Sequence, residues 1–495
     1  MNRICIAALT LTWLACGPSV PGFPEPEAWS TRGPGGPTVL FNDTDLLSHC
    51  AYLTGGAEDH EHHNLVVMHD GYLLMPWAPE DASGGISFFE FDDPCNPIKI
   101  GEGYDIGMRE SHTMAFGTVG GREYLAVDYQ IADDAGGIGF WDITEPTAPV
   151  WVSELELPDY SYPDAYFRVA LSTFWQGDML YVSAGLNGVF VVDVTDPLSP
   201  ELIHQHREVG HLVGSFHVIG NLAMSSSAGL AQTFLYDMSD PLGFDPIPGG
   251  DWLTQDQDGG QANYYFANIG GRYALFARKD TGGGPVVYDI GGPDAPSFVS
   301  DLNQEDADGG YVFRQNDHLF QGESNFSAVY DFCDPYAPHE IARIELVGDL
   351  DTLTPVGNIA VASVDDDANP GQSSAVVPWQ KEPDTMGPRL ELTSPSDEEH
   401  WVALTSRIGL SFDEMLESRS VHAGSLRVWS TDGDAVPGRF YTQENIVNFV
   451  PDFELSPDTT YVVHIPVDGI ADVTGNPTTR SWSFRFTTGG ELETE

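Results

Sequence analysis

The sequence predicts an all-β protein with two domains, and three observations support this prediction. One sequence element recurs at intervals of about 40 to 50 residues from residue 84 to about residue 383. Within each copy, short runs rich in Val, Ile, Phe and Tyr are broken by Gly, Asp, Asn and Pro, which is the composition of strands and turns. After about residue 387 the recurrence stops, and six or seven alternating strands follow in about 100 residues.

The recurring element contains an Asp-Pro-x-x-Pro turn or a close variant of it. Clear copies span residues 84–97, 136–149 and 187–200, weaker ones 234–241, 286–296 and 328–338, and a degraded one 375–383. The prolines at positions 94, 146, 197, 241, 293, 335 and 383 are separated by 52, 51, 44, 52, 42 and 48 residues. Repeats of this length are propeller blades or paired helices, and the strand composition indicates blades.

The first copy predicts four antiparallel strands, at residues 64–68, 72–75, 86–91 and 98–100. Four strands repeated radially make a β-propeller. Seven copies predict seven blades over residues 38–383, and six or eight blades are the alternatives because the fourth and seventh copies are degraded. The last copy lacks a fourth strand, so we expect residues 38–41 to pair there and close the ring. The aspartate and proline of each turn are expected to end the third strand.

The third copy, Val189-Phe-Val-Val-Asp193-Val-Thr-Asp196-Pro197-Leu-Ser-Pro200, carries a family resemblance. It resembles the repeat of the bacterial LVIVD-repeat family of propeller proteins, and the resemblance covers roughly residues 60–380. Members of that family are mostly surface or secreted proteins with no established reaction. The resemblance therefore implies an architecture more than an activity.

The N-terminus predicts export and lipid anchoring. Arg3 precedes an apolar stretch at residues 4–15 that is too short to span a membrane. It ends in Trp13-Leu-Ala-Cys16-Gly17, which resembles a bacterial lipoprotein cleavage site with Cys16 as the lipidated residue. Residues 1–16 are then the signal peptide and the Pro/Gly-rich residues 17–37 a tether, so only the lipid contacts the membrane. Gly17 favours sorting to the outer membrane; an unlipidated secreted protein is the alternative.

Residues 388–489 are predicted to form an immunoglobulin-like sandwich, with strands near 390–395, 408–415, 425–429, 446–449, 460–465 and 482–487. Four segments resemble the bacterial Ig-like domain found in S-layer proteins: Phe412-Asp-Glu-Met415, residues 455–461, Gly469-Ile-Ala-Asp472-Val-Thr-Gly-Asn476 and residues 484–488. The resemblance implies a spacer or adhesion module. Residues 490–495 are an acidic tail.

Three further cysteines, Cys50, Cys95 and Cys333, could form one disulfide in an oxidising compartment. Cys95 and Cys333 occupy similar places in the first and sixth copies, so the ring would hold them apart. A Cys50–Cys95 bond would attach the N-terminal segment to the first blade. Three unpaired thiols are the alternative.

The chain is strongly acidic: 20 Lys and Arg stand against 75 Asp and Glu, a net charge of −55. Such a polyanion repels nucleic acid and anionic lipid, which excludes a nucleic-acid partner. The charge either keeps an exported protein soluble or in part binds Ca²⁺, for which Asp256 with Asp258 and Asp306 with Asp308 are candidates. Neither pair completes an EF-hand, because the twelfth position lacks a carboxylate. Both pairs are expected on the same face of the ring.

Histidines near the starts of predicted inner strands are candidate transition-metal ligands. The best set is His63 and His112 with His211 or His217 as the third ligand, because side chains from separate blades can converge in the channel. They do not recur at one fixed offset, so structural histidines are the alternative. No nucleophile elbow, phosphate loop or dinucleotide motif occurs in the sequence.

Together these features predict a non-enzymatic, lipid-anchored binding or adhesion protein of the bacterial outer membrane or cell surface. Its propeller face would recognise a protein or glycan, with the Ig-like domain as spacer or second contact. The alternative is a metal-dependent hydrolase or oxidase that uses a histidine site in the channel. Apart from the transition metal of that histidine set, calcium is the one cofactor for which the sequence offers candidate ligands.

Overall fold

The computed structural model describes residues 36–56, 65–78, 83–132, 135–160, 167–279, 282–292, 295–364 and 367–490. These residues form β-strands and one short 3-10 helix, η2 (Ser418–Ser420). The strands make nine four-stranded sheets, seven within residues 51–378 and two within residues 390–488. No helix of the described chain is long and apolar enough to cross a membrane.

Six of the seven sheets in the first domain are meanders of four consecutive antiparallel strands. They consist of β2 (Val67–His69), β3 (Tyr72–Trp77), β4 (Gly84–Glu90) and β5 (Ile98–Asp105); β6 (Ala115–Val119), β7 (Arg122–Ala132), β8 (Ala135–Asp142) and β9 (Val150–Glu156); β10 (Ser172–Gln176), β11 (Met179–Ser183), β12 (Val189–Asp193) and β13 (Glu201–His206); β14 (Val213–Ile219), β15 (Leu222–Ser227), β16 (Gln232–Asp237) and β17 (Asp245–Leu253); β18 (Tyr264–Gly270), β19 (Tyr273–Arg278), β20 (Pro285–Asp289) and β21 (Ser297–Asp301); β22 (Val312–Gln315), β23 (His318–Gly322), β24 (Ser327–Asp331) and β25 (His339–Ile344).

The seventh sheet joins the two ends of this domain. It contains β26 (Leu350–Val356), β27 (Ile359–Val364), β28 (Ser374–Pro378) and, beside β28, the N-terminal strand β1 (Ala51–Leu53). The expectation that the beginning of the chain completes the last sheet is confirmed, but the strand is residues 51–53 rather than 38–41. The earlier segment lies beyond the end of β28, where the Phe41 amide donates to the Lys381 carbonyl (3.0 Å). A disulfide between Cys50 and Cys95 ties β1 to the first sheet.

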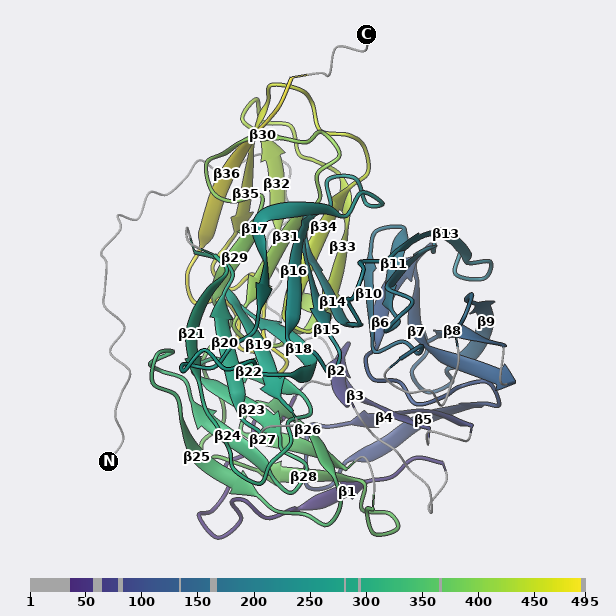
Figure 1. Ribbon diagram of the computed structural model, residues 1–495, viewed down its shortest axis with the longest axis vertical. Coiled ribbons are helices and arrows are strands. Elements are labelled where there is room, and N and C mark those ends of the chain that lie inside the picture. Colours follow the sequence, from purple (N-terminus) through teal and green to yellow (C-terminus); the bar gives the residue numbers. More distant parts are fainter. Residues whose placement is uncertain are drawn as a thin grey trace.

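The seven sheets are arranged around a common centre (Figure 1). The first strands of successive sheets contact each other from β6 through β10, β14, β18 and β22 to β26. His69 on β2 stacks on Phe116 of β6 (3.9 Å between ring centroids), which extends the series to the first sheet. This is the arrangement of a β-propeller, in which the innermost strands surround the axis.

The aspartates of the repeated turn have the structural role that the sequence suggested. After β12, the Asp193 carboxylate accepts a hydrogen bond from the Thr195 amide (2.9 Å), and the Asp196 carboxylate accepts one from the Leu198 amide (3.1 Å). Backbone amides that no longer pair with a neighbouring strand thus donate to aspartate side chains instead. These hydrogen bonds end the third strand of the sheet.

The second domain is a sandwich of two sheets. One contains β29 (Leu390–Ser394), β31 (Ile408–Phe412), β34 (Ile446–Pro451) and β33 (Gly438–Gln443); the other contains β30 (Glu399–Val402), β36 (Trp482–Thr488), β35 (Thr460–Ile465) and β32 (Arg427–Ser430). Alternate residues of both sheets, among them Leu410, Phe449, Val463 and Phe486, form one hydrophobic core. This is the immunoglobulin-like architecture that the sequence predicted.

Candidate functional site

The Ig-like domain covers one face of the propeller, which limits where a partner can bind. That face includes the hairpins between the first and second strands of the sheets, and the turn between β16 and β17, where the Ser239 carbonyl accepts a hydrogen bond from Thr405 (3.0 Å). Five of these hairpins bond to the Ig-like domain: Asp70 to Ser418 (3.1 Å), Asp178 to Arg439 (2.6 Å), Gly220 to Asn448 (2.7 Å), Gly271 to Phe412 (2.7 Å) and Asn316 to Asp413 (3.1 Å). The contacts run from the first sheet to the sixth, so the Ig-like domain spans the ring.

The two domains approach each other closely at Gly220 and Asn448. The Asn448 carbonyl oxygen accepts hydrogen bonds from the Gly220 amide (2.7 Å) and the Gln176 side chain (3.0 Å), and its amide group donates to the Val218 carbonyl (2.9 Å). Gly409 of β31 packs against the same turn: a Cβ on Gly409 would lie 1.9 Å from the Gly220 nitrogen. The two backbones are therefore in direct contact, and no side chain fits between them.

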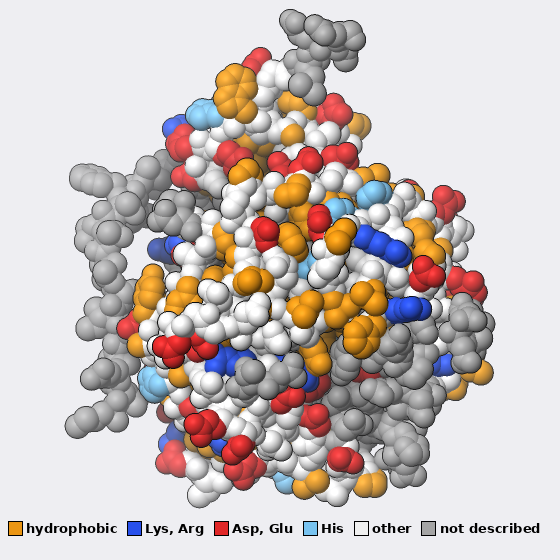
Figure 2. Space-filling model, viewed as in Figure 1, with side chains coloured by type: hydrophobic (Ala, Val, Ile, Leu, Met, Phe, Trp, Pro, Cys, Tyr) orange, Lys and Arg blue, Asp and Glu red, His pale blue; other side chains and the backbone are white. Residues whose placement is uncertain are grey.

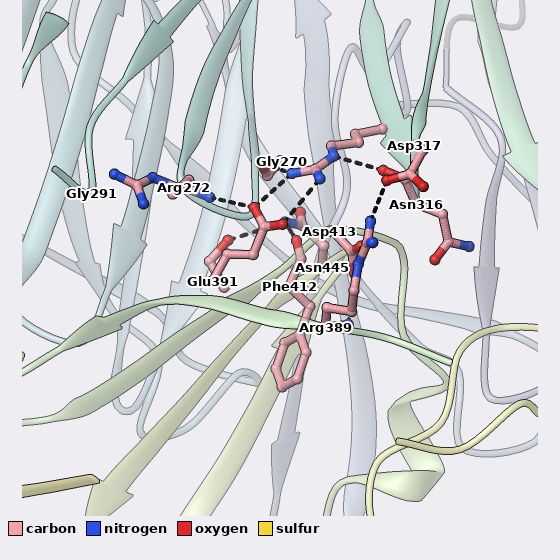
Figure 3. A network of polar contacts seen from close by, with 12 residues as sticks. Gly270, Arg272, Gly291, Asn316, Asp317, Arg389, Glu391, Phe412, Asp413 and Asn445 are labelled. Atoms are coloured by element: carbon pink, nitrogen blue, oxygen red, sulfur yellow. Dashed lines mark hydrogen bonds and ion pairs between the residues drawn. The ribbon is translucent and has the colours of Figure 1, made fainter. Parts of the chain in front are cut away.

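Partly buried ion pairs also join the domains (Figure 3). Arg314 on β22 donates to both carboxylate oxygens of Glu391 on β29 (2.7 and 3.1 Å). Figure 3 shows Arg389 placed between Asp317 of the propeller and Asp413 of the Ig-like domain, at 2.7 and 2.5 Å. Burial raises the pKa of the Asp413 carboxyl, and the charges of Arg314 and Arg389 oppose that shift. The interface thus contains a paired charge network of the kind that is costly to break on one side only.

The opposite face of the propeller is not covered by the Ig-like domain, and it contains a pocket of about 590 Å³ between the third and fourth sheets. Large apolar side chains surround it: Val209 is fully exposed, and Leu186, Phe167 and Leu230 are 56%, 50% and 43% exposed. Apolar side chains also gather near the middle of the face seen in Figure 2. Contiguous exposed apolar side chains are characteristic of interaction surfaces.

Backbone and side-chain hydrogen bonds hold the loops that form this pocket. The Leu186 amide donates to the Phe167 carbonyl (2.8 Å), and Gly185 pairs with Val213 on β14. The Arg207 guanidinium donates to the backbone carbonyl of the buried Asn187 (3.2 Å), which fixes the rim. The pocket walls therefore come from four separate loops and from strand β18, and the propeller sets the positions of all of them.

His211 lies at this pocket and is held as a neutral residue. Its two ring nitrogens are 2.9 Å from the Ser225 hydroxyl and 2.8 Å from the Ser227 hydroxyl. Burial, with a smaller effect of the nearby His206, lowers the pKa of His211 to about 4. His217, on β14, lies beside Phe174 (6.1 Å between ring centroids), and burial lowers its pKa to about 4 as well. Both predicted ligands are therefore uncharged at neutral pH.

His112 lies elsewhere, near the axis of the propeller. Its ring is buried 3.1 Å from a Glu110 carboxylate oxygen and 5.5 Å from the Phe266 ring, and the Tyr311 hydroxyl donates to its backbone carbonyl (2.8 Å). Burial, followed by the charge of Glu110, raises the pKa of Asp128 well above its usual value. Aromatic and carboxyl side chains thus fill the central region around His112.

Two groups of three metal-ligating side chains come together in the described chain: His69 with Asp70 and Glu123, and Asp384 with Glu414 and Asp472. Neither group contains the predicted ligands His112, His211 or His217, and His63 lies outside the described residues. The predicted lipidation residue, Cys16, is also outside them. The histidine set stays a prediction. The sequence pattern gave no signal for the two groups found, because their members come from distant segments.

The predicted calcium ligands lie in loops that connect successive sheets. The Asp256 carboxylate accepts hydrogen bonds from the backbone amides of Asp258 (3.0 Å) and Gly260 (2.7 Å), which closes a turn. The Asp306 carbonyl accepts a hydrogen bond from Asn325 (2.9 Å), and an Asp308 carboxylate oxygen lies 3.8 Å from the Lys279 amine. Asp256 and Asp308 therefore have protein partners, and calcium binding by these loops stays a prediction.

Comparison with known proteins identifies the second domain. Residues 384–488 match the family of bacterial Ig-like domains. No curated protein matches the chain. Similar solved structures include the RRP9 WD40 repeats (12% identity, TM-score 0.48, 69% of this chain and 99% of that chain). Another is the Cps50 (Swd1) β-propeller domain of Myceliophteria thermophila (9% identity, TM-score 0.47, 66% and 99%).

Bacterial Ig-like domains of this family occur in bacterial surface proteins. The combination of a propeller of repeated four-stranded sheets with such a domain fits a binding role. The pocket residues could not be found from the sequence, because exposed Val and Leu residues in loops follow no recurrent spacing.

Proposed function

We propose that this chain is a non-enzymatic, lipid-anchored binding protein of the bacterial outer membrane or cell surface, and that its uncovered propeller face recognises a protein. The observation that carries the proposal is the pocket between the third and fourth sheets. It lies opposite the Ig-like domain and is surrounded by the exposed side chains of Phe167, Leu186, Val209 and Leu230. A cavity of several hundred Å³ with apolar walls accommodates one or more apolar side chains of a partner.

Apolar contact favours a protein over a glycan as the partner. Burying a leucine-sized side chain contributes about 1.5–3 kcal/mol. The polar groups at the pocket include Arg207, which is bonded to Asn187, and His211, which is bonded to two serines. Glu208, the other charged residue at the pocket, lies 3.3 Å from a His206 ring nitrogen, so the charged side chains at the pocket already have partners in the protein. The net charge of −55 further favours a neutral or basic partner surface.

The anchoring part of the proposal rests on the sequence. A signal peptide at residues 1–16, lipidation at Cys16 and a tether at residues 17–37 would hold the propeller at the membrane. The resemblance to the LVIVD-repeat family supports a surface location, as does the family of the Ig-like domain. We further propose that the seven sheets within residues 51–378 are the seven blades of one ring, closed by β1.

Binding can be tested by charge substitution at the pocket. Immobilised protein is incubated with a bacterial envelope fraction, and the variant Leu186→Asp is compared with Leu198→Asp. Leu198 is a matched control because it is equally exposed (55% against 56%) but lies in the turn after β12, toward the other end of the sheet. We expect Leu186→Asp to reduce partner capture at least tenfold and Leu198→Asp to leave it unchanged.

The same experiment distinguishes the partner classes. Protease treatment of the envelope fraction should abolish capture, whereas periodate oxidation of glycans should not. If capture survives protease treatment but is lost after periodate oxidation, the partner is a glycan and not a protein. Equal capture by the wild type and by Leu186→Asp would show that the partner does not bind at the pocket.

The enzymatic alternative retains one observation in its favour, the buried group of Glu110, His112 and Asp128 near the axis. Carboxyl groups with strongly shifted pKa values are common at catalytic sites, although structural networks shift them too. Elemental analysis decides between the two functions. A stoichiometric transition metal that is lost from a His63→Ala, His112→Ala variant would favour the enzyme.

A further inference from the structure

Three carboxylates converge where the Ig-like domain meets the propeller. Asp384 lies in the segment between β28 and β29, Glu414 directly after β31, and Asp472 in the loop between β35 and β36. One oxygen of each carboxylate lies within 4.8 Å of the others. The three residues are only 8%, 2% and 1% exposed. Two oxygen ligands on opposite sides of a calcium ion, at about 2.4 Å each, are separated by about the same distance.

A fourth polar side chain reaches this group from the propeller. The amide group of Asn316, in the hairpin between β22 and β23, donates to Glu414 (3.0 Å) and to Asp384 (3.3 Å). Asn316 is 2% exposed, and its carbonyl oxygen has no hydrogen-bond partner in the described structure, like one oxygen of Glu414. An asparagine amide presents its oxygen or its nitrogen with almost the same shape. The opposite orientation would direct an unused carbonyl oxygen at the three carboxylates.

The negative charge of this group is not balanced by a basic side chain in the described structure. The ion pairs of the described residues do not include Asp384, Glu414 or Asp472, and the nearby Arg389 is already bonded to Asp317 and Asp413. The Asp472 carboxylate accepts hydrogen bonds from Thr474 (2.8 Å) and Asn476 (2.9 Å), and the Asp384 carboxylate accepts one from the Met386 amide (3.0 Å). Buried carboxylates that have hydrogen bonds but no counter-charge remain unfavourable, so such a group accepts either protons or a cation.

We propose that Asp384, Glu414, Asp472 and Asn316 form a calcium site that fastens the Ig-like domain to the propeller. The donors are all oxygen atoms of carboxylates and an amide, which suit a hard cation and not zinc or copper. Ca²⁺ accepts irregular sets of six to eight oxygens, whereas Mg²⁺ requires a near-ideal octahedron and retains water. Asn316 belongs to the propeller and the carboxylates follow it in the linker and the Ig-like domain, so binding one ion opposes separation of the domains.

Calcium titration of the full chain tests the site. Protein freed of metal with a chelator is titrated with CaCl₂ by calorimetry, and its Tm is measured with and without 2 mM CaCl₂. We expect one binding event and an upward shift of Tm of roughly 2–5 °C for the wild type, as for a ligand well above its Kd. The isosteric variant Glu414→Gln should bind Ca²⁺ at least tenfold more weakly and lose the shift.

Two further measurements distinguish a variant that has lost the calcium site from a variant that has failed to fold. Without calcium, Glu414→Gln should be at least as stable as the wild type, because it removes a buried carboxylate and keeps its shape. The double variant Asp256→Asn, Asp258→Asn separates this site from the loop site that the sequence predicts, and it should retain the calcium-dependent shift of Tm, since these residues belong to an exposed turn. The proposal is overturned if the wild type binds no calcium at 10 mM, or if Glu414→Gln responds to calcium as the wild type does. An equal response to MgCl₂ would also contradict the assignment to calcium.

Discussion

Replacing Asn448 by leucine tests whether the Ig-like domain is fastened to the propeller as described. Asn448 is buried and uses its whole amide: its oxygen accepts from Gly220 (2.7 Å) and Gln176 (3.0 Å), and its nitrogen donates to Val218 (2.9 Å). Leucine has a similar volume but makes none of these bonds. The variant therefore removes the Asn448 partner of the Gly220 amide, of the Val218 carbonyl and of the Gln176 side-chain amide, which still donates to the Gly220 carbonyl (2.8 Å).

The magnitude follows from these three groups. A buried donor or acceptor that loses its partner costs about 1–3 kcal/mol, and the new apolar side chain recovers part of that. We expect Asn448→Leu to lower the free energy of unfolding by about 3–6 kcal/mol. The loss should appear in urea unfolding of the full chain. It should also accelerate hydrogen exchange at Gly271 and Asn316, whose amides donate to the Ig-like domain elsewhere in the interface.

The matched control is Asn187→Leu, because Asn187 is a buried asparagine on the uncovered face of the propeller whose amide donates to the Asp159 carbonyl (3.1 Å). It should destabilise the protein without changing exchange at Gly271 or Asn316. If Asn448→Leu costs less than about 1 kcal/mol and exchange at both amides is unchanged, the two domains are not coupled through this contact, and the interface described above is refuted.

Three further predictions concern single features of the fold. Cys95→Ser opens the loop closed by the Cys50–Cys95 disulfide and should lower the free energy of unfolding by about 4 kcal/mol in thermal unfolding under oxidising conditions. Under reducing conditions the difference between the variant and the wild type should be smaller, and an equal difference in both conditions would contradict the prediction. Gly409→Ala places a methyl group against the Gly220 backbone and should separate the domains, seen as faster proteolysis of the linker; resistance equal to the wild type would contradict this. His211 binds its proton only below about pH 4 when folded and near pH 6.5 when unfolded, so its contribution to stability is lost as the pH falls from 6.5 to 4. His211→Asn should flatten that part of the pH profile relative to the wild type.

The repeated sheets could be predicted because their signals are local. Strand β12 (Val189–Asp193) lies within the third copy of the repeated element, residues 187–200, and the turn after it forms through aspartate side chains that bond to their own neighbouring backbone. Alternating apolar residues and turn residues act within a few positions of each other, so the sequence contains the information directly. The Ig-like domain was predictable for the same reason, through several short segments in a characteristic order.

Pairings between distant segments were less predictable. The strand that closes the ring was expected at residues 38–41 and is residues 51–53, although both are short apolar segments near the N-terminus. Which of them pairs with β28 depends on where the chain enters the first sheet, and the Cys50–Cys95 disulfide fixes that entry beside Ala51. Local composition does not distinguish two such candidates, because strand pairing depends on cross-strand neighbours.

The residues at the interface and in the carboxylate group had no recognisable spacing. Asn316, Asp384, Glu414 and Asp472 are separated by 68, 30 and 58 residues and belong to four different segments. Glu414 and Asp472 were recognised as parts of the Ig-like motif, but the motif says nothing of a partner domain. Glu414 and Asp472 come together within the Ig-like domain, where Leu416 pairs with Asp472, and Asn316 joins them only when that domain docks on the propeller. Both are tertiary contacts that periodicity does not encode.

The two faces of the propeller therefore have separable roles, and this separation can be checked. Backbone amides of Gly220, Gly271 and Asn316 bond to the Ig-like domain, so changes at that face alter docking. The loops around Leu186 bond among themselves and to the propeller, as Leu186 does to Phe167, so changes there leave docking intact. Leu186→Asp should consequently retain the wild-type calcium response while losing partner capture. Glu414→Gln should lose the calcium response and still capture the partner, because the pocket is built entirely from propeller residues.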